Sequence, residues 1–211
     1  FNWGKDFIHW SERDGWAHLY LYDEKGNLKN RITKGPWHVE KVLKVDEASR
    51  TIYFLANGRE EGENPYYEHL YRVNADGSGL KLLTKGDFFH QVAVDDEARF
   101  MVDNFSRVNT IPCADLIDRN GRKVMTIQES DFSQLMAAGY QFPELFKVKA
   151  ADGVTDLYGV MYKPFNFDST KVYPIIDYVY PGPQVEAVYY PFTRMSVRTD
   201  RLAPVSYTHL T

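Results

Sequence analysis

Short apolar runs separated by Gly, Asn and Asp turns recur along residues 1–130. One stretch contains four such runs, at 7–11, 18–22, 28–33 and 38–45. Runs of this length that are rich in β-branched and aromatic residues are typical of β-strands, and turns such as Asp23-Glu24-Lys25-Gly26 suit tight connections. The pattern therefore predicts four-stranded antiparallel units.

The pattern also repeats at an interval of 51 residues. His18-Leu19-Tyr20 recurs as His69-Leu70-Tyr71, and Ile32-Thr33-Lys34-Gly35 recurs as Leu83-Thr84-Lys85-Gly86, while 114–127 matches part of a third copy. A four-stranded unit of this period cannot bury its faces alone, so neighbouring units stack around an axis as propeller blades. We expect about two to three blades here, and because closure takes roughly four to eight, we expect the others upstream.

The pattern changes after Thr126. Residues 133–138 predict a short helix that ends at Gly139, and 145–149 with 157–162 predict a strand pair. Tyr173–Pro183 (YPIIDYVYPGP) then predicts a buried strand that ends at Pro-Gly-Pro. The predicted fold is mostly β: a partial β-propeller followed by the first strands of a second domain.

Composition and charge exclude several function classes. A net charge of −4 without a basic stripe argues against nucleic acid, and no apolar run reaches the roughly 18 residues of a membrane span. The single cysteine, Cys113, rules out an intrachain disulfide. The six histidines lack metal-ligand spacing, and His18 and His69 occupy equivalent repeat positions that favour packing. We expect neither a metal nor another cofactor.

Few residues in this chain are candidates for catalysis. No G-x-S-x-G motif exposes a nucleophilic serine, and the acidic pair Glu60-Glu61 is interpreted as a solvated hairpin tip rather than a carboxylate site. Tyr180 is a phenol at the C-terminal end of the predicted strand, where α/β folds place their chemistry. From the residues alone, Tyr180 is either a functional phenol or one of 15 tyrosines that pack strands.

Three motifs in series resemble the dipeptidyl peptidase IV branch of the prolyl oligopeptidase family. They are Ser11–Tyr20 (SERDGWAHLY), Thr33–Trp37 (TKGPW) and Tyr173–Pro183, and the resemblance extends from about Phe7 to about Arg201. It implies an eight-bladed propeller and an α/β-hydrolase domain whose Ser-Asp-His triad cleaves dipeptides, often after Pro or Ala, from peptide N-termini. It also implies that Tyr180 donates a hydrogen bond in the oxyanion hole.

The resemblance divides the chain into three parts. Residues 1–130 correspond to the last propeller blades, residues 131–203 to a connector and the start of the α/β-hydrolase domain, and residues 204–211 do not match and are expected to be a non-native tail. The triad residues would lie downstream, so we expect these residues alone to be inactive. Glu60-Glu61 do not match the family's amine-binding glutamates. Peptide substrates, a periplasmic, secreted or cell-envelope location and a homodimeric parent are compatible with the resemblance.

Two alternatives stay open at this point. A prolyl oligopeptidase-type endopeptidase or an acylaminoacyl-peptidase would share the architecture but would not need glutamates that hold a free N-terminus. A non-catalytic propeller scaffold would use Tyr173–Pro183 only as a final strand, and relatives of such enzymes that have lost the serine keep the fold.

Overall fold

The computed structural model describes residues 2–3, 5–164, 166–176 and 190–192. The chain divides into two compact units, one of residues 1–105 and 113–129 and the other of residues 106–112 and 130–211. Each unit is described by itself below. Tyr180 and the 204–211 segment lie outside the described residues.

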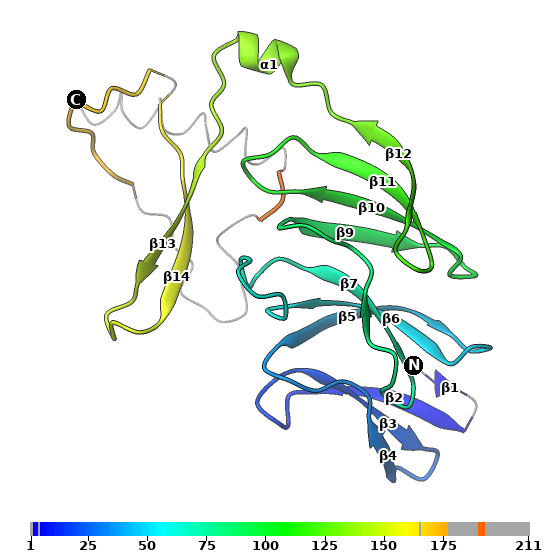
Figure 1. The fold of residues 1–211 in the computed structure, drawn as a ribbon. Helices are drawn as coiled ribbons and strands as arrows, with labels where there is room; N and C mark the ends of the chain where they lie inside the picture. Colours follow the sequence, from blue (N-terminus) through cyan, green and yellow to red (C-terminus); the bar gives the residue numbers. More distant parts are fainter. Residues whose placement is uncertain (1, 4, 165, 177–189, 193–211) are drawn as a thin grey trace. The chain divides into compact units, whose positions relative to one another are not determined.

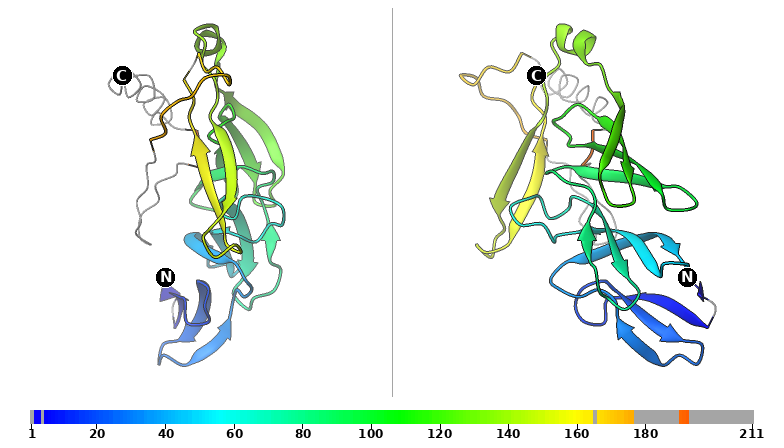
Figure 2. Two further views of the ribbon diagram at one scale, coloured as in Figure 1. Left: turned by 90° about the vertical axis from the view of Figure 1, so that its left-hand side faces the viewer. Right: turned by 45° about the vertical axis from the view of Figure 1, so that its right-hand side comes forward.

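The first unit contains three four-stranded antiparallel sheets, stacked in chain order from blue to green in Figures 1 and 2. The first sheet comprises β1 (Asn2–Trp3), β2 (Asp6–Ser11), β3 (His18–Asp23) and β4 (Leu28–Arg31). The second comprises β5 (His38–Asp46), β6 (Thr51–Asn57), β7 (His69–Asn74) and β8 (Lys81–Leu82). The third comprises β9 (Phe89–Val94), β10 (Phe100–Ser106), β11 (Cys113–Asp118) and β12 (Lys123–Glu129).

One part of the predicted strand grouping is wrong. The run at 38–45 was grouped with the three strands before it, but it forms β5, which pairs with β6 and so opens the second sheet. The connection at 32–37 hides this break because it is only six residues long and three of them, Ile32, Thr33 and Trp37, are buried like strand residues. The third copy, which the sequence indicated only in part, is a complete four-stranded sheet.

The core of the first unit lies in two layers between the three sheets. Strand β6 contributes side chains to both layers because successive strand residues point to opposite faces. Ile52, Phe54 and Ala56 pack toward the first sheet with Leu19, Trp37 and Val39, whereas Tyr53 and Leu55 pack with Leu70, Leu83 and Met101. Burial on both faces explains why this segment reads as a continuous apolar run instead of an alternating one.

Hydrogen bonds at equivalent positions also join the sheets. The backbone N–H of Val39 donates to the Ala17 carbonyl at 2.9 Å, and 51 residues later the N–H of His90 donates to the Glu68 carbonyl at 3.1 Å. The repeat seen in the sequence is therefore a repeat of the contacts between sheets.

The second unit contains the predicted helix and strand pair. Helix α1 (Ser133–Ala137) is followed two residues later by Gly139, which adopts a φ of 89° that favours glycine. Strands β13 (Glu144–Lys149) and β14 (Asp156–Met161) form an antiparallel hairpin, with Leu145 opposite Val160.

Candidate functional site

The segment that leads toward Tyr180 departs from the sequence prediction in its described part. Ile175 and Ile176 were expected in a buried strand, but they have no strand structure and are 92 % and 62 % exposed. A buried strand needs hydrogen-bonded neighbours, and among the described residues none pairs with 173–176. Tyr180 itself lies outside the described residues, so its role stays a prediction.

Phe192 is anchored within the second unit. The ring of Phe192 lies 4.9 Å from Phe132 and 6.3 Å from Phe142, and Tyr140 contacts both Phe142 and Phe192. The backbone N–H of Phe192 donates to the Ser106 hydroxyl at 2.9 Å. This aromatic cluster therefore holds Phe192 against Phe132, Tyr140 and Phe142 of the same unit.

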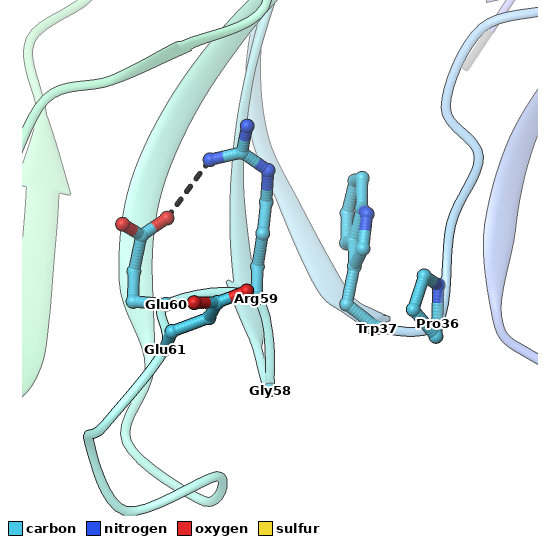
Figure 3. A pocket seen from close by; sticks show the side chains of 6 residues that line it. All are labelled: Pro36, Trp37, Gly58, Arg59, Glu60 and Glu61. Carbon is cyan, nitrogen blue, oxygen red and sulfur yellow. Dashed lines mark hydrogen bonds and ion pairs between the residues drawn. The ribbon is translucent and has the colours of Figure 1, made fainter.

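An open surface depression in the first unit is a candidate binding site. It is about 510 Å³ in volume and is lined by Pro36, Trp37 and the loop residues Gly58, Arg59, Glu60 and Glu61. Figure 3 shows the Arg59 and Glu60 side chains directed toward each other on one side, with Trp37 and Pro36 across from them. The two sides come from the connection before β5 and from the loop after β6.

The two glutamates of this loop behave differently. Glu61 is exposed, as expected for a loop tip. Glu60 is only partly exposed, because its carboxylate accepts hydrogen bonds from the Tyr71 hydroxyl and from Arg59, each at 2.8 Å. The interpretation of Glu60 as part of a solvated tip is therefore wrong. Sequence reasoning missed its partner because Tyr71 lies on β7, at the far end of the loop.

Electrostatics keep Tyr71 in its neutral form. Burial, followed by the hydrogen bond to the Glu60 carboxylate, raises the pKa of Tyr71 far above its ordinary value. The Arg59 guanidinium lies 5.3 Å from the centre of the Tyr71 ring, within cation–π distance. The side of the depression formed by Arg59 and Glu60 is thus an ion pair, and its carboxylate accepts a hydrogen bond from the neutral phenol of Tyr71. The residues that line the depression include no nucleophile.

The predicted packing role of His18 agrees with its contacts. Its Nε2–H donates to the Gly35 carbonyl at 2.9 Å, and its Nδ1 accepts from the Thr33 hydroxyl at 3.0 Å. Burial lowers the pKa of His18, so the ring stays neutral. Among the described residues, no three His, Cys, Asp or Glu side chains are arranged to hold a metal ion.

Sequence reasoning missed that His90 is buried beside a carboxylate. His90 Nδ1 lies 2.9 Å from the Asp103 carboxylate, and both side chains are buried. A signal was present, because His90 stands 51 residues after Val39, where the repeat has an apolar residue. No helix in the described part of the chain is long and apolar enough to cross a membrane.

The chain is a mostly β protein, and its successive four-stranded antiparallel sheets are consistent with part of a propeller. A family model for the "Dipeptidyl peptidase IV (DPP IV) N-terminal region" matches residues 1–112. The chain therefore belongs to the dipeptidyl peptidase IV family, as its motifs indicated.

Individual relatives match a longer part of the chain. Dipeptidyl peptidase 4 of Arthroderma otae is 28 % identical over 193 residues, which cover 88 % of this chain and 24 % of the relative. Human dipeptidyl peptidase 8 is 30 % identical over 189 residues, covering 83 % of this chain and 20 % of the relative. The crystal structure of Porphyromonas gingivalis dipeptidyl peptidase 4 aligns with a TM-score of 0.75 at 26 % identity, covering 92 % of this chain and 27 % of that one. The chain thus spans about a quarter of the length of its relatives.

Proposed function

We propose that this chain is part of a serine exopeptidase that releases N-terminal dipeptides, with Pro or Ala at the penultimate position, by acyl-enzyme hydrolysis. The observation that carries the proposal is the family match over residues 1–112 together with relatives, named as dipeptidyl peptidases, that align over more than four-fifths of the chain. Within this proposal, residues 1–130 are propeller blades and residues 131–203 begin the hydrolase domain.

In this proposal Tyr180 is the side-chain donor of the oxyanion hole. A phenolic O–H held at a strand end can donate to the negative charge that develops on the scissile carbonyl, and one such donor contributes about 3–4 kcal/mol to the transition state. The nucleophile, its histidine and its aspartate would come from other residues of the parent protein, so a polypeptide of these 211 residues would be inactive.

The test uses the full-length protein encoded by the gene that contains this sequence. We expect it to hydrolyse a Gly-Pro chromogenic substrate, and we expect Tyr180→Phe to lower kcat by about 100-fold or more because one oxyanion donor is lost. Tyr178→Phe is the matched control, since it removes a hydroxyl from the same motif and should leave kcat nearly unchanged.

Two results would contradict parts of the proposal. Equal turnover of wild type and Tyr180→Phe would exclude the phenol as a donor, whereas absence of any peptidase activity would favour a propeller scaffold. Cleavage of a substrate with a blocked N-terminus would indicate an endopeptidase instead. A cell-envelope location and a homodimeric state are proposed on the family resemblance alone, and cell fractionation and light scattering would test them.

A further inference from the structure

Four titratable side chains lie in a row in the first unit, three of them almost fully buried. His69 Nε2 lies 2.8 Å from a Glu63 carboxylate oxygen, and His90 Nδ1 lies 2.9 and 3.0 Å from the two Asp103 oxygens. The centres of the two imidazole rings are 4.8 Å apart. The exposed fractions of the His69, His90 and Asp103 side chains are 3, 1 and 6 %.

The repeat shows that packing does not require this arrangement. In the first copy, His18 satisfies both ring nitrogens with the neutral partners Thr33 and Gly35. In the second copy, Thr84 accepts a hydrogen bond from the Leu70 N–H, as Thr33 does from Leu19. His69, however, makes its hydrogen bond through Nε2 to the Glu63 carboxylate. The position equivalent to His90 is Val39, which pairs with Ala56 across β5 and β6. Val39 makes no side-chain hydrogen bond of the kind that His90 makes with Asp103, because its side chain is apolar.

The hydrogen bonds assign the protons of the two rings. Each carboxylate accepts an N–H, so His90 is protonated at Nδ1 and His69 at Nε2. His69 Nδ1 and His90 Nε2 are both buried, and neither has a hydrogen-bond partner among the described residues. A second proton on His69 would therefore create a buried N–H without an acceptor and a positive charge close to the His90 ring.

Glu63 connects this buried pair to the loop that separates β6 and β7. The loop at 58–68 contributes the Arg59, Glu60 and Glu61 side chains of the depression, and two of its contacts with β7 are Glu63 to His69 and Glu60 to Tyr71. The His69 side chain is only 3 % exposed, whereas that of Glu63 is 22 % exposed, so Glu63 lies between the buried ring and the surface of the loop. Loop opening and proton uptake by His69 are consequently linked.

We propose that the His69–His90 pair is an acid-sensitive latch that holds the 58–68 loop closed at neutral pH and releases it as the pH falls. The groups that act on His69 are His90 from β9 and Glu60 and Glu63 from the loop, and Asp103 from β10 holds His90 in place. The consequence is that acid opens one wall of the depression without unfolding the sheets.

The direction of the effect follows from linkage. Burial, and then the neighbouring His90 imidazole, lower the pKa of His69 in the closed state, against the raising effects of Glu63 and Glu60. An exposed His69 in the open state would return to the ordinary value of 6.5. The closed state is therefore favoured fully above this value and loses stability below it. For one linked proton, the opening constant should rise about tenfold between about pH 7.5 and about pH 5.5.

Hydrogen–deuterium exchange of the full-length gene product, read by mass spectrometry on peptides that cover 58–68, measures this opening. After correction for the intrinsic exchange rate at each pH, we expect the tenfold increase in wild type. His69→Gln keeps an N–H donor for Glu63 but cannot take up a proton, so its increase should fall below about twofold. His18→Gln is the matched control at the equivalent repeat position and should keep the full increase in this loop.

Retention of the tenfold increase in His69→Gln, or a loop in wild type that does not respond to pH, would overturn the proposal. A second measurement needs no variant, so its result does not depend on whether His69→Gln folds. Exchange at the C2 position of each imidazole reports the pKa of His69 in the unmodified protein. We expect that pKa below 6.5, and a pKa at or above this value would overturn the latch.

Discussion

Two threonines show how the same residue acts differently in two copies of the repeat. The Oγ1 atoms of Thr33 and Thr84 accept the backbone N–H groups of Leu19 and Leu70, at 3.0 and 2.9 Å, and both threonines are buried. Thr33 also donates its hydroxyl proton to His18 Nδ1. A hydroxyl at this position is needed because a buried backbone N–H without an acceptor is costly.

We predict that Thr33→Val destabilises the first unit more than Thr84→Val does. Valine keeps the shape of threonine, so the loss reports the hydroxyl. Thr84→Val leaves one buried N–H unpaired and should cost about 1–3 kcal/mol, whereas Thr33→Val also leaves His18 Nδ1 unpaired and should cost more. Urea denaturation of the full-length gene product, followed by tryptophan fluorescence, measures both. Equal losses would mean that the His18 contact contributes nothing.

At the scale of elements, the turn glycines determine how closely neighbouring sheets approach. Gly77, in the turn between β7 and β8, has a φ of 87°, and a Cβ there would lie 3.0 Å from the Ile32 carbonyl oxygen of the preceding sheet. Gly121, in the turn between β11 and β12, has a φ of 77°, and a Cβ there would overlap the Leu83 carbonyl oxygen and lie 2.8 Å from its Cα. Ile32 and Leu83 are themselves repeat equivalents, so the same contact recurs.

We predict that Gly121→Ala is markedly more destabilising than Gly153→Ala. Both glycines have positive φ, so each substitution carries a backbone cost of about 1–2 kcal/mol. Only at Gly121 does the new methyl meet the backbone of another sheet, which adds roughly 1–3 kcal/mol, whereas no atom lies within 4 Å at Gly153. Thermal unfolding of the two variants compares them. Equal shifts in Tm would show that the third sheet adjusts without cost.

Local sequence patterns predicted secondary-structure elements better than they predicted which strands pair and which side chains are in contact. Strands such as His18–Asp23, helix α1 and the β13–β14 hairpin follow from periodicity and turn residues near in sequence. The prediction of the sheet to which β5 belongs was wrong because half of the short connection before this strand is buried. The contacts of Glu60 with Tyr71 and of His90 with Asp103 were missed because strand pairing brings together residues that are more than ten positions apart.

At the scale of the whole molecule, the outer edge of the third sheet is apolar and open. Strand β12 pairs only with β11 in the described part of the chain, and all seven of its residues are exposed. Val124, Met125 and Ile127 are each about half exposed. An unpaired strand edge with apolar side chains is a template for association with another chain. The relatives are about four times longer, and in proteins of that length further residues are available to cover such an edge.

We therefore predict that a polypeptide of these 211 residues alone associates as its concentration rises, whereas the full-length gene product does so much less. Lysine at both Val124 and Ile127 should suppress the association, because charge on an edge strand opposes pairing with a second edge. Lysine at Val154, which is 77 % exposed in a hairpin turn, adds charge away from this edge and should suppress it less. Light scattering over a concentration series measures all four proteins. A monodisperse, cooperatively melting monomer would show instead that β12 is protected within this segment, and association would then have to be sought at another surface.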